Sequence, residues 1–212
     1  QMIKIPETSK PIDACLGEPM MCVANIVRAV EPKMGDRIAV IGCGFMGLMV
    51  IAGLKSQALG DIVAIDLDEK RLEMAVQYGA TKTLNPKNVD VEDASFELTH
   101  GRMYDCIVEI TGSLRGLQTA LSVAKISGRG KILAPSVYSK NETWTEEMAY
   151  NMMYRSPIIH VVHPYYTNEY MYTLGIGVDA YVKGVFPTEE FITHRIPFER
   201  VSEGFQLLDT NP

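Results

Sequence analysis

Three glycines and one acid in this chain have the spacing of a phosphate-binding turn. Gly42, Gly44 and Gly47 form a Gly-x-Gly-x-x-Gly pattern, and Asp66 closes the next apolar run. In such a pattern the first glycine allows a tight turn, the second lets the backbone approach a pyrophosphate, and the third lets a helix pack closely. The amides of that helix, with the positive end of its dipole, then attract the phosphates.

Asp66 predicts which dinucleotide is bound. A carboxylate at the end of the second strand can accept hydrogen bonds from both hydroxyls of the adenosine ribose. The 2′-phosphate of NADP would meet it as a like charge, so Asp66 favours NAD. Phe45 and Met46 supply amides of the turn, and Leu67 follows the acid.

The elements that must position these residues are readable in the flanking sequence. An apolar run at 38–41 enters the glycines, an apolar segment of helical length follows, and a β-branched run ends on Asp66. This order of strand, turn, helix and strand is the dinucleotide-binding βαβ unit. A domain that binds another adenine nucleotide, or has lost its ligand, would share the pattern.

The rest of the chain repeats the alternation of strand and helix. Further strands are expected at 82–84, 104–110, 131–135 and 158–162, with helices between them and a last helix at 168–183. Six such strands predict an α/β fold with a doubly wound parallel sheet, a Rossmann fold. Ligands bind at the carboxyl ends of such strands. Four further residues are expected on that edge: Thr111, Gly112, Ser136 and His163.

Three parts of the chain differ in character. We expect a connector and entry helix at 1–30, the dinucleotide-binding domain at 31–185, and a return segment at 186–212. The return segment is predicted to hold a strand, a turn at Pro197 and a helix at 199–208.

Composition excludes several classes of protein. The chain has 212 residues, 47% of them hydrophobic, and a net charge of −6 without a run of Lys and Arg. This balance argues against a nucleic-acid partner. We expect no membrane partner, and no signal peptide is visible at the start. Four cysteines without a Cys-x-x-Cys pair predict free thiols in a reducing cytoplasm.

A set of short motifs resembles the zinc-dependent medium-chain alcohol, polyol and threonine dehydrogenases. The matching segments are 17–19 (Gly-Glu-Pro), 32–35, 42–47, Asp66 with Arg71, 78–81, and 192–195 (Ile-Thr-His-Arg). The resemblance extends over nearly the whole chain and is more specific than the glycine pattern alone.

The resemblance implies roles for several residues. Arg71 would cover the adenosine, Thr111 and Gly112 would line the adenine pocket, and Ser136 and His163 would face the nicotinamide. Glu18 would lie at or near the catalytic zinc, although an acid in a first helical turn also suits the helix dipole. Members of the family use NAD and zinc to oxidise small substrates: secondary alcohols, polyols, sugars or hydroxy amino acids. They are homo-oligomers, dimers or tetramers, and often pair through an edge of the sheet.

The chain departs from the family in one respect. The separate domain that carries the other zinc ligands is missing, and a catalytic zinc normally takes three protein ligands. We therefore expect the cofactor domain of a larger dehydrogenase, incomplete at both ends and inactive by itself. A naturally short, non-catalytic redox-sensing module and a methyltransferase with a similar glycine-rich turn remain open alternatives.

Overall fold

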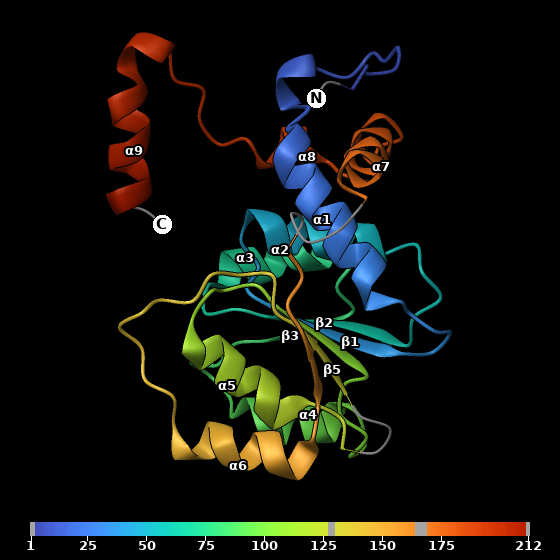
Figure 1. Ribbon diagram of the computed structural model, residues 1–212, viewed down its shortest axis with the longest axis vertical. Coiled ribbons are helices and arrows are strands. Elements are labelled where there is room, and N and C mark those ends of the chain that lie inside the picture. Colours follow the sequence, from blue (N-terminus) through green and yellow to red (C-terminus); the bar gives the residue numbers. More distant parts are fainter. Residues whose placement is uncertain (1–2, 127–129, 164–168, 211–212) are drawn as a thin grey trace.

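A six-stranded, all-parallel sheet organises the chain (Figure 1). The computed structural model describes residues 3–126, 130–163 and 169–210. The strand order is β3-β2-β1-β4-β5-β6, so the chain reverses direction across the sheet between β1 and β4. The strands are β1 (Arg37–Ile41), β2 (Asp61–Ile65), β3 (Lys82–Leu84), β4 (Cys106–Glu109), β5 (Lys131–Leu133) and β6 (Ile158–His160). The predicted fold class is confirmed.

Helices cover both faces of the sheet. Figure 1 shows α1, α2, α3 and α7 on one side and α4, α5 and α6 on the other. Their bounds are α1 (Gly17–Val30), α2 (Phe45–Leu54), α3 (Glu69–Tyr78), α4 (Val91–Leu98), α5 (Leu114–Val123), α6 (Glu146–Arg155) and α7 (Tyr170–Val182). The expected start of the last of these, at 168, lies outside the described residues. None of the helices in the described part of the chain combines the length and apolarity that a bilayer span requires.

The core lies in two layers because alternate residues of a strand point to opposite faces. On β1, Ile38 and Val40 join the cluster under α1, α2 and α7, while Ala39 and Ile41 join the cluster over α5. Both sides of β1 are therefore buried, which explains its continuous apolar sequence.

Helix starts follow ordinary capping chemistry. Asp68, Asp90, Ser113 and Thr145 cap α3, α4, α5 and α6, each accepting a hydrogen bond from an amide of the first turn. Satisfying these amides fixes where each helix begins, and so fixes the loops that leave the strands.

The return segment differs from expectation. Its described residues form a short helix α8 (Thr188–Phe191), a 3-10 turn η3 (Phe198–Arg200) and α9 (Val201–Thr210), and the strand expected before Pro197 is wrong. The Thr188 hydroxyl donates to the Ala14 carbonyl at 2.6 Å, and Glu190 accepts from the Tyr78 hydroxyl at 2.6 Å. These bonds hold α8 against the end of α3 and the residues before α1, and none of the described residues of the return segment joins the sheet.

Candidate functional site

Two of the three motif glycines are required by packing inside the protein. Gly42 has a φ of +98°, and a Cβ there would lie 2.9 Å from Cγ2 of Thr111. A Cβ on Gly47 would lie 1.9 Å from the Gly42 carbonyl oxygen. No side chain fits at Gly42, because the residues that follow β4 pack against it, and none fits at Gly47, because the first turn of α2 sits directly on the loop that follows β1.

Gly44 is different, because nothing inside the protein requires it. Its backbone is extended (φ −71°, ψ −171°), a conformation open to any residue, and a Cβ there would meet no atom within 4 Å. Gly44 is the N-cap of α2 and offers no side-chain acceptor. The first amides of α2, those of Phe45, Met46 and Gly47, therefore start a helix beside open space. This arrangement suits an anion that approaches the backbone closely.

Asp66 lies directly beside the glycine turn. Its carboxylate accepts hydrogen bonds from the Cys43 amide at 2.6 Å and from the Asp68 amide at 2.9 Å. The end of β2 and the turn after β1 are thus joined by one side chain. Burial, and then the Asp66 charge, raise the pKa of the Cys43 thiol to about 12. The thiol therefore stays neutral beside the turn.

Leu67 and Arg71 lie on the Asp66 side of the site. Leu67 follows the acid and is 48% exposed. Arg71 is in the first turn of α3, and its amide donates to the N-cap Asp68 at 3.4 Å. Both residues follow the carboxyl end of β2, Leu67 in the loop and Arg71 at the start of α3.

Thr111 and Gly112 lie on the other side of the turn, at the end of β4. Thr111 packs against Gly42, since its Cγ2 atom would lie 2.9 Å from a Cβ at that glycine. Gly112 has a φ of +73°, and a Cβ there would lie 3.1 Å from the carbonyl oxygen of Val137 and 3.5 Å from Cβ of Ser136. The structure therefore brings Thr111, Gly112 and Ser136 together. His163 lies three residues beyond the end of β6, the strand that pairs with β5.

Sequence reasoning missed Glu109, the last residue of β4. This side chain is fully buried and accepts three hydrogen bonds. Two come from Thr111, the amide at 2.9 Å and the hydroxyl at 2.5 Å, and the third comes from the Tyr138 hydroxyl at 2.6 Å. Burial, with the bond to Glu109, raises the pKa of Tyr138. The available signal was one acid inside the otherwise apolar end of a strand, because buried acids are rare unless paired.

Glu18 lies in the first turn of α1, where it accepts from the Cys22 thiol at 3.1 Å. Burial, then this bond, raise the pKa of the Cys22 thiol to about 12, so the thiol is protonated at neutral pH. Within the described ranges, no three His, Cys, Asp or Glu residues lie close enough to hold a metal ion. The described residues alone therefore do not fit a catalytic zinc. All four cysteines are free thiols.

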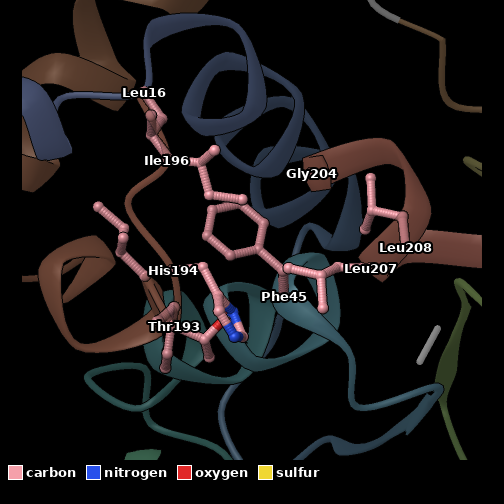
Figure 2. A pocket seen from close by; sticks show the side chains of 10 residues that line it. Leu16, Phe45, Thr193, His194, Ile196, Gly204, Leu207 and Leu208 are labelled. Carbon is pink, nitrogen blue, oxygen red and sulfur yellow. The ribbon is translucent and has the colours of Figure 1, made fainter. Parts of the chain in front are cut away.

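An open pocket of about 630 Å³ adjoins the glycine turn (Figure 2). Phe45 of the turn points into it, facing Ile196 and Leu207 of the return segment and α9. His194 also lines it, with Nδ1 2.9 Å from the Thr193 hydroxyl. The lining is mainly apolar and connects the turn to the return segment.

The fold and the site together define a class. A parallel sheet in the order 3-2-1-4-5-6, a glycine turn where the order reverses, and an acid at the end of β2 are the features of a Rossmann-type domain. The model of the zinc-binding dehydrogenase family matches residues 46–156, more than half of the chain. The chain belongs to this family.

Individual relatives agree with this assignment. The chain is 28% identical over 198 residues to L-threonine 3-dehydrogenase of Bacillus licheniformis, an alignment covering 92% of this chain and 54% of that protein. It is 29% identical over 185 residues to alcohol dehydrogenase 1 of Pisum sativum, covering 86% and 47%. The fold matches alcohol dehydrogenase TADH from Thermus sp. ATN1 with a TM-score of 0.81 at 22% identity, covering 98% and 59%. The chain thus spans about half the length of the curated relatives it matches.

Proposed function

We propose that this chain is the NAD-binding domain of a zinc-type medium-chain dehydrogenase. In the intact enzyme it would hold NAD for hydride transfer to or from a small secondary alcohol, polyol, sugar or hydroxy amino acid. The observation that carries the proposal is Gly44: neither packing nor backbone conformation explains this glycine, and the open space in front of it faces the free amides of α2. The dehydrogenase names of the relatives support the reaction class.

The pyrophosphate would bind at the start of α2. The amides of Phe45, Met46 and Gly47 have no partner within the helix, and the helix dipole adds a positive field there. Gly44 lets the phosphate oxygens reach these amides without meeting a side chain. Dinucleotide binding at this turn therefore needs no cationic side chain.

The adenosine would lie on the Asp66 side of the turn. A carboxylate has about four acceptor sites, and the Cys43 and Asp68 amides use two of them. Two remain for the two hydroxyls of the ribose. Leu67 and Arg71 would flank the adenosine on this side.

Thr111 and Gly112, which follow β4, would line the adenine side of the crevice near Gly42. The other half of the dinucleotide would lie toward β5 and β6, where Ser136 and His163 would face the nicotinamide. The bound nicotinamide supplies the hydride acceptor, and the residues of this chain position it. The division into 1–30, 31–185 and 186–212 follows from this assignment, with the outer parts contacting the rest of the enzyme.

Zinc and the substrate would be bound mainly by residues outside this chain. The relatives are about twice as long as the aligned region, which leaves room for a separate catalytic part. Glu18 would approach the zinc from this domain. The free cysteines fit a cytoplasmic, reducing compartment, and the net charge of −6 fits the absence of a nucleic-acid partner.

We further propose a homo-oligomer, a dimer or tetramer, that forms through β6. In the described part of the sheet, β6 pairs on one side only, with β5. Ile158 is 48% exposed, and Val161 just beyond the strand is 67% exposed. An exposed apolar edge strand favours pairing with another strand.

Direct titration tests the cofactor assignment. Calorimetry of the 212-residue chain with NADH, NADPH and S-adenosylmethionine should show binding of NADH, weaker binding of NADPH, and no binding of S-adenosylmethionine. A preference for S-adenosylmethionine would point to a methyltransferase. Absence of NADH binding at millimolar concentration would overturn the proposal.

A further inference from the structure

Two loops at the carboxyl end of the sheet are tied together beside the candidate site. One loop, residues 110–113, joins β4 to α5, and the other, residues 134–145, joins β5 to α6. Figure 1 shows the second loop, in yellow, running out past α5 toward α6. The loops touch at Gly112, where a Cβ would lie 3.1 Å from the Val137 carbonyl oxygen. Glu142 also accepts a hydrogen bond from the Leu114 amide at the start of α5.

The strongest link between the loops passes through Glu109. One carboxylate oxygen accepts both hydrogen bonds from Thr111, and the other accepts from the Tyr138 hydroxyl at 2.6 Å. The carboxylate cannot shift toward α5, because even a Cβ on Gly116 would lie 2.4 Å from it. Glu109 is therefore a fixed point from which both loops are held.

The second loop has few other anchors near the site. Val137 is 87% exposed, and the next three residues after Tyr138 are exposed as well. Tyr138 itself is half-buried against the core under α5. Its hydroxyl thus makes a polar contact between this loop and the end of β4, one residue from Val137.

Strand order assigns the second of these loops to one half of the ligand. Asp66 follows β2 on one side of β1, whereas the loop at 134–145 follows β5, two strands away on the other side. We propose that Glu109 is a positioning residue which, through Tyr138, holds the loop after β5 against the nicotinamide half of bound NAD. This inference rests on the proposed function. It adds to that function the residue Glu109 and its hydrogen bond with Tyr138, which we call the tether.

If the tether holds the loop in place, loss of the Tyr138 hydroxyl should change the affinity for NADH but not the affinity for AMP. AMP contains the adenosine half only. Its contacts with Asp66 and Thr111 do not depend on the Tyr138 hydroxyl, because the bonds from Thr111 to Glu109 remain when that hydroxyl is removed. NADH needs both sides of the crevice. Tyr138→Phe keeps the ring and removes the hydroxyl, and we expect it to weaken NADH binding about fivefold while leaving AMP affinity unchanged, as befits the loss of one hydrogen bond.

Two matched variants accompany this one. Tyr154→Phe makes the same chemical change on the outer face of α6, where the side chain is 55% exposed, and should alter neither ligand. Glu109→Gln should keep NADH affinity within about twofold of the parent chain. The amide oxygen can still accept from Thr111, and the amide nitrogen can donate to the Tyr138 hydroxyl, whose oxygen also accepts.

Calorimetric titrations of all four proteins with NADH and with AMP decide the matter, after thermal unfolding has shown that each variant is folded. Weaker NADH binding with unchanged AMP binding in Tyr138→Phe, and near-parental binding in Glu109→Gln, support the tether. Equal losses of both ligands, or no loss of NADH, in Tyr138→Phe overturn it. Absence of NADH binding by the parent chain is a separate result, which refutes the proposed function itself.

Discussion

Replacing Gly44 by alanine separates the demands of the ligand from those of the fold. The new methyl group would meet no atom of the protein within 4 Å, and the extended backbone at this position suits alanine. The methyl group would instead occupy the open space in front of the first amides of α2. A pyrophosphate placed there would have to move outward.

The expected magnitudes follow from this geometry. Alanine restricts the unfolded chain, which stabilises the fold by about 0.4–1 kcal/mol. It is a poorer N-cap than glycine, which costs a comparable amount. The free energy of unfolding should therefore change by less than about 1 kcal/mol, or about 4 °C in melting temperature. Losing one charge-assisted hydrogen bond to a phosphate costs about 1.5–3 kcal/mol, so the Kd for NADH should rise about 10- to 150-fold.

Gly47→Ala is the matched control. The same methyl group placed three residues later would lie 1.9 Å from the Gly42 carbonyl oxygen. Relieving that overlap requires α2 to move off the turn, so we expect a loss of about 3 kcal/mol or more in the free energy of unfolding. One variant should thus lose the ligand and keep the fold, and the other should lose the fold.

Urea unfolding and NADH titration on the same preparations provide the test. The reasoning is refuted if Gly44→Ala binds NADH as tightly as the parent chain. It is equally refuted if Gly44→Ala is destabilised as strongly as Gly47→Ala, since the position would then be structural.

Three further perturbations have defined outcomes. Asp66→Asn should weaken NADH binding about tenfold, because the neutral amide cannot accept hydrogen bonds from both ribose hydroxyls. It should also reduce the ratio of NADH affinity to NADPH affinity, because the amide no longer repels a 2′-phosphate. An unchanged ratio would contradict this role of Asp66. The pKa of Asp105 lies below its ordinary 3.8, because burial, which raises it, is outweighed by hydrogen bonds from the Arg37 amide and from Lys125. Its contribution to stability is therefore complete above that value and is lost as the pH falls through the lower folded-state pKa, so urea titrations from pH 7 to 2 should show a steeper acid loss for the parent chain than for Asp105→Asn. Val161→Lys places a charge beside the exposed edge of β6 and should reduce the sedimenting mass to that of a single chain, whereas an unchanged oligomer would place the interface elsewhere.

The pattern of the sequence was sufficient for the sheet and for the turn. Hydrophobic runs with glycine and acid at their ends are local signals. They predicted all six strands and the turn that Gly42, Gly44 and Gly47 form between β1 and α2. Strand ends were less predictable. The run at 104–110 shortened to Cys106–Glu109, and Tyr104 forms only an isolated bridge with Ala124. Pairing, which depends on the neighbouring strand, decides where a ladder stops.

The return segment shows the same limit more strongly. Its alternating residues before Pro197 are typical of a strand, yet the structure has α8 followed by an unpaired extended stretch. A strand exists only with a partner, and the bonds of Thr188 and Glu190 tie the start of this segment to Ala14 and to Tyr78 of α3, not to a strand.

The sequence by itself determined the class of this protein, because a βαβ unit with a glycine turn is built from residues close together in the chain. Only the tertiary structure decided how the polar groups around that turn are shared. Asp66 bonds to the Cys43 amide, and Glu109 bonds to Tyr138, across separations that no local pattern encodes. The physical reason is that a buried carboxylate must find its donors wherever packing places them, and packing is a property of the whole sheet.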